Sequence, residues 1–345
     1  MIDYSRSYVS RWRVYRVNER TWLNGEPLDG FVNGSISVTR DASGDAPRIE
    51  SGSMEVRGEL PRGYYRIVME SDQDGTTTTD NIATLLFETS DGDERRGVLW
   101  TKAQGQSVLY PAYTERIASG EYAPAGVDGA QYAARMLRRC VKAPVVVDGG
   151  FTLNAQIVHD FGARILEAVW QVLAAGGFVI QIHGDGEIHI LPMPTVPALV
   201  LDDTGAELLT PGTKHGNSTA SIPNRYRAED ELETAVVVND DPESSVSTVS
   251  RGYIFDELDT SPCPVDGETL ERYAARRLEE LSTLEETREY GREWARGVYP
   301  FSVVKASADT IGVDGNLRVL SQSIECSHGA YVTEQAYREV KLWQA

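Results

Sequence analysis

The longest ordered pattern in the chain is a helical pattern that leads into a hairpin pattern, between Thr152 and Pro194. Apolar residues recur here at helical spacing; they are Leu153, Ile157, Val158, Phe161, Ile165, Leu166, Val169, Val172 and Leu173. The spacing predicts one helix over residues 152–177 that buries a single side. A hairpin directly after such a helix predicts a compact α/β unit around it.

The hairpin pattern, FVIQIHGDGEIHILPMP, begins at Phe178. A three-residue loop at 184–186 with Gly186 in the left-handed region places four isoleucines on one face, in the pairs Ile182–Ile188 and Ile180–Ile190. A two-residue turn would instead set Ile182 opposite His189 and mix the two faces. We therefore favour the three-residue loop. The opposite, polar face then carries Gln181, His183, Glu187 and His189.

The charge balance limits the kinds of partner. The chain has 52 acidic and 33 basic residues, a formal net charge of -19. A protein that grips nucleic acid by its phosphates needs a basic surface, so this function is disfavoured. Solubility through self-repulsion accounts for the balance. The sharper alternative is an acidic wall past which an anionic polymer slides without sticking.

The sequence contains neither a membrane segment nor a metal-binding cysteine pattern. No run of eighteen apolar residues occurs, and the N-terminus lacks a signal-peptide core, so we expect synthesis in the cytoplasm. Cys140, Cys263 and Cys326 are scattered without CxxC spacing, which predicts reduced, partly buried thiols.

Residues 1–115 are expected to be all β, as a barrel or a sandwich. The predicted strands are Arg13–Val17, Ser35–Arg40, Ser53–Arg57, Tyr64–Glu70, Ala83–Glu88 and Gly97–Lys102. Two acidic segments, residues 41–46 and 71–81, are expected to be longer loops. Residues 116–195 form the α/β domain, with an amphipathic helix over 129–142, a strand over 144–148, and the long helix and hairpin.

From residue 196 the chain is β-rich again, and the expected order of the whole is β, α/β, β, long helix, β. The predicted strands are Ala198–Leu201, Ser221–Ala228, Thr234–Asn239, Ser250–Phe255, Phe301–Lys305, Thr310–Val313, Asn316–Ser323 and Ala336–Trp343. Asp266 is the predicted cap of a third helix with a stripe that runs from Leu270 to Leu284. Residues 196–260 and 300–345 form one predicted β domain, and 261–299 a helical insertion.

Three polar residues of the hairpin and one histidine before it are candidates for a functional site. His183, Glu187 and His189 share a hairpin face and could bind a metal, but a solvated or subunit-facing surface is the favoured interpretation. His159 is expected at the surface of the long helix.

Two further groups of residues are candidates for ligand binding. Asp72, Asp74 and Asp80 resemble a calcium loop without EF-hand spacing, and an acidic hairpin loop explains them as well. The aromatic residues Tyr8, Trp12, Tyr15 and Trp22 could stack on sugars, although core or interface packing is favoured.

Signatures of catalysis are missing from the sequence. There is no GxSxG, no Walker loop and no dinucleotide glycine pattern. Paired carboxylates for glycoside hydrolysis are made in space and stay open on abundance alone. We predict no catalytic, cofactor-binding or metal-binding residues and no enzymatic activity.

Three segments resemble the hub proteins of phage tails and contractile injection machines. They are the helix and hairpin FVIQIHGDGEIHILPMP, the stretch IPNRYRAEDELETAVVVNDDPESSVSTVSRG at 222–252, and the helix ERYAARRLEELSTLEE that leads through a proline to closing strands. Their order covers residues 120–345.

The resemblance implies a β-rich α+β fold with two tail-tube-like β-barrels and interposed α/β domains. It implies a homotrimer that joins a sixfold tail tube to a threefold spike or fibre and forms part of the DNA-ejection channel. The implied partners are the distal tail or tail-tube protein, the tape-measure protein and the spike or fibre protein, and the implied location is the virion. Since the chain stops at Ala345 without an enzymatic extension, we expect a hub alone. The alternative is a carbohydrate-binding or cell-wall-degrading tail protein.

Overall fold

The computed structural model describes residues 8–32, 34–95, 97–118, 120–202, 214–216, 219–229, 233–260, 262, 269–308, 313–327 and 329–344. The chain divides into two compact units. The first contains Met1–Thr213 and Glu289–Ala336, and the second contains Lys214–Arg288 and Tyr337–Ala345. The chain therefore leaves the first unit, builds the second and returns.

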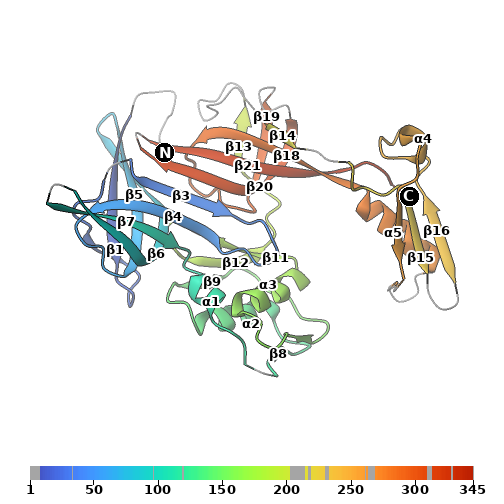
Figure 1. Ribbon diagram of the computed structural model, residues 1–345, viewed down its shortest axis with the longest axis horizontal. Coiled ribbons are helices and arrows are strands. Elements are labelled where there is room, and N and C mark those ends of the chain that lie inside the picture. Colours follow the sequence, from blue (N-terminus) through green and yellow to red (C-terminus); the bar gives the residue numbers. More distant parts are fainter. Residues whose placement is uncertain are drawn as a thin grey trace. The chain divides into compact units, whose positions relative to one another are not determined.

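The first unit begins with seven antiparallel strands (Figure 1). They are β1 (Val9–Val17), β2 (Asn24–Pro27), β3 (Ile36–Asp41), β4 (Ile49–Arg57), β5 (Gly63–Gln73), β6 (Thr76–Arg95) and β7 (Val98–Gln106), in the order β3-β4-β7-β6-β5-β1-β2. Alternate residues of β3 are buried, as Ile36 and Val38 show. This period of two places one side of each strand in a shared apolar core.

The segment 71–81, predicted as a loop, is a hairpin in the structure. Strand β5 continues to Gln73 and β6 begins at Thr76, with Gln73 opposite Thr76. The turn residues Asp74 and Gly75 have φ of 53° and 79°. Positive φ at both central residues is the conformation of a tight hairpin turn, and threonine favours strands, so the loop prediction was wrong.

The α/β part contains helices α1 (Tyr110–Thr114), α2 (Gly129–Arg138) and α3 (Ile165–Ala175), of which α2 and α3 pack together (Figure 1). Strands β11 (Phe178–Ile182), β12 (Ile188–Pro192) and β9 (Val145–Val147) form a sheet in that order. A second, two-stranded sheet joins β8 (Tyr122–Ala123) to β10 (Ile157–Val158). Apolar residues of both helices and of the three-stranded sheet form one core.

The predicted register of the hairpin β11–β12 is confirmed. Ile182 pairs with Ile188 and Ile180 with Ile190, and all four side chains are fully buried. Gly186 has a φ of 81°, and its N–H donates to the carbonyl of His183 at 2.8 Å. The three-residue loop therefore places the isoleucines on one face, as the sequence predicts.

The predicted long helix is shorter than expected, because α3 begins only at Ile165. Residues 157–158 belong to β10, and Gly162 adopts a φ of 76°, which a helix does not tolerate. Phe161, predicted on the buried stripe, is 87% exposed. His159, predicted at the surface, is buried, and its Nδ1 lies 3.0 Å from Oε1 of Gln171.

The first unit also contains β13 (Pro197–Asp202), β19 (Val303–Ala308) and β20 (Val313–Cys326). Strand β20 pairs antiparallel with β3 and with β19, and β19 pairs parallel with β13. The chain passes between the two units in β18 (Thr283–Glu293) and β21 (Ala330–Lys341). Strands β13 and β18–β21 thus belong to the same large sheet as β1–β7, whereas β8–β12 form the two small sheets. This establishes a β-rich α+β fold, and the two barrels stay a prediction.

The second unit is a small α/β structure. Strands β16 (Thr234–Val238), β15 (Arg225–Glu229) and β17 (Asp256–Asp259) form a sheet in that order, and the unit also contains β14 (Lys214–Gly216) and α4 (Thr248–Arg251). Helix α5 (Leu270–Leu281) packs on β15 and β16 through Tyr273, Ala274 and Leu278.

Two predictions in this region were wrong. Residues 250–255, predicted as a strand, contain the end of α4 and a loop. The third helix ends at Leu281, and Leu284 belongs to β18. Asp266, Cys263 and residues 309–312 lie outside the described residues. None of the described helices combines the length and apolar character that a membrane span requires.

Candidate functional site

The polar face of the hairpin β11–β12 packs inside the first unit. Gln181 Nε2 donates to the carbonyl of Pro300 at 2.9 Å, and the His183 ring stacks on Tyr299 with centroids 4.7 Å apart. The prediction of a solvated surface is therefore wrong for Gln181 and His183, whereas Glu187 stays partly exposed and a subunit-facing role of this face stays a prediction. The sequence pattern located the face but could not show that the turn at residues 299–302 covers part of it.

The histidines of this face do not form a metal centre. His183 stacks on His189 with ring centroids 3.8 Å apart, and His189 Nδ1 lies 3.0 Å from Oδ2 of Asp148. Burial, with a smaller contribution from the neighbouring His189, lowers the pKa of His183 to about 4, so its ring is neutral at pH 7. No three histidine, cysteine or carboxylate side chains among the described residues are grouped to hold a metal ion.

The tip of the hairpin is fixed to the N-terminal strands. The carbonyl of Asp185 accepts from Trp22 Nε1 at 2.8 Å and from Arg66 Nη2 at 2.7 Å, and Thr84 Oγ1 donates to the carbonyl of Gly184 at 3.0 Å. A Cβ on Gly184 would lie 1.8 Å from the carbonyl oxygen of Asn81. Only glycine therefore permits this approach.

A buried ion pair lies at the junction of β3, β4 and β20. Arg40 Nε donates to Oε1 of Glu50 at 2.7 Å, and both side chains are fully buried. Arg40 Nη1 donates to Oε1 of Gln322 at 3.3 Å, and the guanidinium lies 5.0 Å from the ring centroid of Tyr299. A buried charge needs such partners, because desolvation disfavours an unpaired ion.

The second carboxylate of this region, Glu334, is also fully buried. It accepts from Tyr290 Oη at 2.5 Å, from Arg292 Nε at 3.1 Å and from Gln322 Nε2 at 2.8 Å. Gln322 joins the two ion pairs, since its other amide atom accepts from Arg40. We refer to Arg40, Glu50, Tyr290, Arg292, Gln322 and Glu334 as the buried polar network.

Sequence reasoning missed the buried polar network. A signal was present, because Arg40 continues the alternation of Ile36 and Val38 and so occupies an inward position of β3. Burial raises the pKa of Glu50 to about 7, against the opposing effect of the Arg40 charge. The other oxygen of this carboxylate, Oε2, has no hydrogen-bond partner in the described part of the chain. Because its groups are buried and paired with one another, the network is best explained as a set of contacts that holds neighbouring strands of the unit together, rather than as a catalytic centre.

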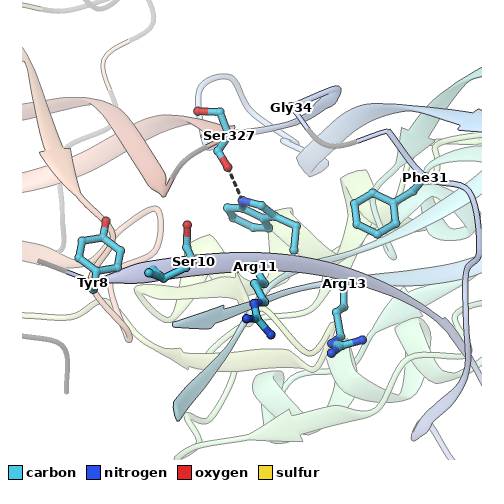
Figure 2. Close-up of a pocket in the computed structure, with 9 residues that line it drawn as sticks. Tyr8, Ser10, Arg11, Arg13, Phe31, Gly34 and Ser327 are labelled. Atoms are coloured by element: carbon cyan, nitrogen blue, oxygen red, sulfur yellow. Dashed lines mark hydrogen bonds between the residues drawn. The ribbon is translucent and has the colours of Figure 1, made fainter. Parts of the chain in front are cut away.

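A cavity of about 850 Å³ lies along β1 (Figure 2). Figure 2 shows Ser10, Phe31 and Ser327 on one side of the strand, and Arg11 and Arg13 on the other. Trp12 Nε1 donates to the carbonyl of Ser327 at 2.8 Å, and Arg13 pairs with Glu70 at 2.8 Å.

Of the four N-terminal aromatic residues predicted as a possible sugar platform, two belong to the core. Trp12 and Trp22 are 5% and 7% exposed, and Trp22 packs edge-on against Tyr64. Tyr8 lines the cavity along β1, but its hydroxyl lies 3.3 Å from Oε2 of Glu293. The favoured prediction of packing is thus confirmed for the two tryptophans.

Two of the aspartates that resemble a calcium loop, Asp72 and Asp80, have partners within the protein. Asp72 accepts from the N–H of Gly75 at 3.3 Å and from Thr77 Oγ1 at 3.2 Å. Asp80 pairs with Arg296 at 2.8 Å. These contacts give Asp72 and Asp80 a structural role, as the interpretation of an acidic hairpin expects for Asp72.

Burial raises the pKa of the Cys140 thiol to about 11 and also raises the pKa of Cys326. Both are free thiols. They are therefore protonated at neutral pH and poor nucleophiles, as expected for buried cysteines.

Comparison with solved structures identifies the fold. The chain is similar to a tail protein of Neisseria meningitidis, with 13% identity, a TM-score of 0.65, and coverage of 96% of this chain and 97% of that one. It is similar to the 43 kDa tail protein of prophage MuSo2 from Shewanella oneidensis, with 12% identity, a TM-score of 0.63, and coverage of 97% and 99%.

A third similar structure is a component of the Escherichia coli type VI secretion system described as similar to the T4 bacteriophage tail proteins gp27 and gp5. Its identity is 10% and its TM-score 0.51, with coverage of 92% of this chain and 77% of that one. No protein-family model and no curated protein matches the sequence. At these sequence identities the structural similarity establishes the fold alone, and it extends over nearly the whole chain. The chain has the fold of phage tail proteins, as the resemblance in its sequence implies.

Proposed function

We propose that the chain is a structural hub of a phage tail tip or baseplate. The observation that carries this proposal is the match to two phage tail proteins over at least 96% of each chain compared. A match of that extent includes both the large sheet and the inserted second unit, so it compares an entire architecture rather than one common domain. Fold likeness is an analogy for function, which is why an assembly experiment is needed.

In this proposal the hub is a homotrimer. The strands β1–β7 and the strands β13 and β18–β21 are the counterparts of two tail-tube barrels, so that three copies present six barrels to a sixfold tube. The threefold end then receives a spike or fibre. The neighbouring proteins are a distal tail or tail-tube protein, a tape-measure protein and the spike or fibre protein, in a virion assembled in the host cytoplasm.

The same proposal gives the acidic composition a role. The chain has a net charge of -19. In this proposal acidic side chains line an ejection channel, where their carboxylates repel DNA phosphates and so prevent adhesion. In this proposal the chain acts structurally, and the buried polar network, which the fold encloses, stabilises it. Reversing the charge of lumen-facing acids should slow DNA ejection, and unchanged ejection would count against the channel.

The decisive experiment measures assembly. Purified full-length chain is examined by sedimentation velocity over a range of concentrations, followed by negative-stain imaging of the largest species. We expect a trimer and rings with threefold symmetry. A chain that stays monomeric at every concentration, even with neighbouring tail proteins, would overturn the hub proposal.

A further inference from the structure

The two-stranded sheet of β8 and β10 turns an apolar face to solvent. Ile157 pairs with Ala123, and both pack toward the core, whereas the next pair, Val158 and Tyr122, is 62% and 48% exposed. Phe161 follows three residues later and is 87% exposed. Single exposed apolar residues are ordinary, but a cross-strand pair followed by an exposed phenylalanine indicates an interaction surface.

A basic groove adjoins this apolar face. It has a volume of about 510 Å³ and is lined by Glu121, Tyr132, Arg135, Met136, Arg138 and Arg139. Its three arginines face one carboxylate, that of Glu121, which pairs with Arg139. Basic side chains therefore outnumber acidic ones in the groove, whereas in the whole chain acidic residues exceed basic ones by 52 to 33.

Two observations place the groove next to the apolar face. Glu121 lies in the groove and precedes Tyr122 in the chain. Tyr132 Oη lies 3.4 Å from Nε2 of His159, the residue after Val158. The side chain of Arg116 donates to the carbonyl of Gly162 beside Phe161, which adds a cation on that side. Tyrosine and arginine around an apolar centre are the residues enriched at protein interfaces.

The sign of the charge decides which partner fits. Two copies related by a twofold axis through this surface would bring arginines against arginines, an arrangement that like-charge repulsion disfavours. The remainder of the chain is strongly acidic, so a second copy that approaches with a different surface is electrostatically complementary. Such a contact is head-to-tail, the kind that closes into rings.

We propose that Tyr122, Val158 and Phe161, with the arginines of the adjoining groove, receive an acidic surface of a second copy of this chain. The contact is head-to-tail and repeats around the assembly. This inference rests on the proposed function in one respect, namely that copies of the chain assemble into a ring.

The test compares the assembly of variants of the full chain by sedimentation velocity. Phe161→Asp and Arg135→Glu should each weaken association at least tenfold, because one puts a charge in the apolar centre and the other reverses a rim charge. Val196→Asp is the matched control, since Val196 is 76% exposed outside this surface, and it should assemble like the wild type. Circular dichroism confirms that each variant is folded.

The outcomes separate the two proposals. If the wild type assembles and both variants assemble equally well, the docking surface is wrong while the hub proposal stands. If the wild type is monomeric throughout, the hub proposal fails and this inference fails with it. Weakening by Phe161→Asp and Arg135→Glu together, without an effect of Val196→Asp, supports the surface.

A second measurement tests the head-to-tail geometry. A photo-crosslinking amino acid replaces Phe161 in a mixture of ¹⁵N-labelled and unlabelled chains, and mass spectrometry identifies cross-links between copies. We expect mixed-isotope cross-links to acidic segments outside the surface defined above. Cross-links that join position 161 to the same surface of another copy, or only to segments of its own copy, would overturn the inference.

Discussion

Arg40 and Glu50, on adjacent strands, form an ion pair of 2.7 Å in which both side chains are fully buried. Replacing Arg40 with methionine should lower the free energy of unfolding by about 3–5 kcal/mol, because it leaves a buried carboxylate without its counter-ion. Urea denaturation at pH 8 measures this loss.

The control for that substitution is Arg62→Met. Arg62 pairs with Glu88 at 2.5 Å, but its side chain is 73% exposed, so the loss should stay below about 1 kcal/mol. Equal losses in the two variants would mean that burial does not set the strength of the Arg40 pair.

The raised pKa of Glu50 predicts a pH dependence of stability. Between the ordinary carboxyl pKa and about 7, Glu50 binds more protons in the folded state than in the unfolded state. The contribution of this group to stability is therefore lost as the pH rises through that range. Glu50→Gln removes this titration. The stability of the variant relative to the wild type should therefore increase from pH 4.5 to pH 7 and stay constant above. Parallel stability curves for the two proteins, measured by thermal unfolding, would contradict a raised pKa.

The close approach at Gly184 predicts a large effect of one methyl group. In Gly184→Ala the new Cβ would lie 1.8 Å from the Asn81 carbonyl oxygen, so the hairpin tip must move. We expect a loss of roughly 3 kcal/mol. Gly177→Ala is the control, since Gly177 has a φ of 66° with nothing within 4 Å of an added Cβ, and it should cost only about 1–2 kcal/mol of backbone strain. A loss at Gly184 no larger than at Gly177 would show that the tip is adaptable.

The hydroxyl of Tyr290 donates to Glu334 at 2.5 Å inside the buried polar network. Tyr290→Phe keeps the ring and removes this bond, with an expected loss of about 1.5–3 kcal/mol for a hydrogen bond to a charged group. Tyr122→Phe, at a half-exposed residue, should change stability by less than about 0.5 kcal/mol. Chemical denaturation measures the free energy of unfolding of both variants. Similar losses in the two variants would argue against a structural role of the buried polar network.

The second unit can be tested separately through α5. Leu278 is fully buried against β15 and β16, and Leu278→Ala should destabilise that unit by about 2–5 kcal/mol. Hydrogen exchange should then accelerate in β15, β16 and α5 while protection in β3–β7 persists. Leu258→Ala, at a residue 52% exposed, serves as the control. Faster exchange throughout the chain would indicate that the two units unfold together.

The sequence predicted local structure best where one period applied without interruption. The isoleucine pairs of the hairpin were predicted in the correct register, because a period of two and one left-handed glycine determine them. The predicted helix begins at residue 152, thirteen residues before α3 begins at Ile165. Ile157 and Phe161 match helical spacing by position, yet the chain there pairs with β8 and then turns at Gly162.

Contacts between distant segments explain what the sequence could not predict. The polar face of the hairpin resembles surface in the sequence because nothing nearby in the chain covers it. The segment that covers part of it contains Tyr299 and Pro300. The buried polar network likewise joins residues 40 and 50 to residues 290–334. The alternation of buried and exposed residues in β3 predicts that Arg40 points inward, but it does not identify the partners of Arg40.

The pairing of β3 with β20 has a consequence for how the protein is made. Asp41 and Cys326 are the last residues of the two paired strands, and 285 residues separate them (326 minus 41). At roughly 5–20 residues per second, a ribosome needs on the order of 15–60 s to make that interval. During this time the nascent N-terminal sheet has an edge without its final neighbour, so polypeptides that terminate before Val313 should be prone to aggregate during translation.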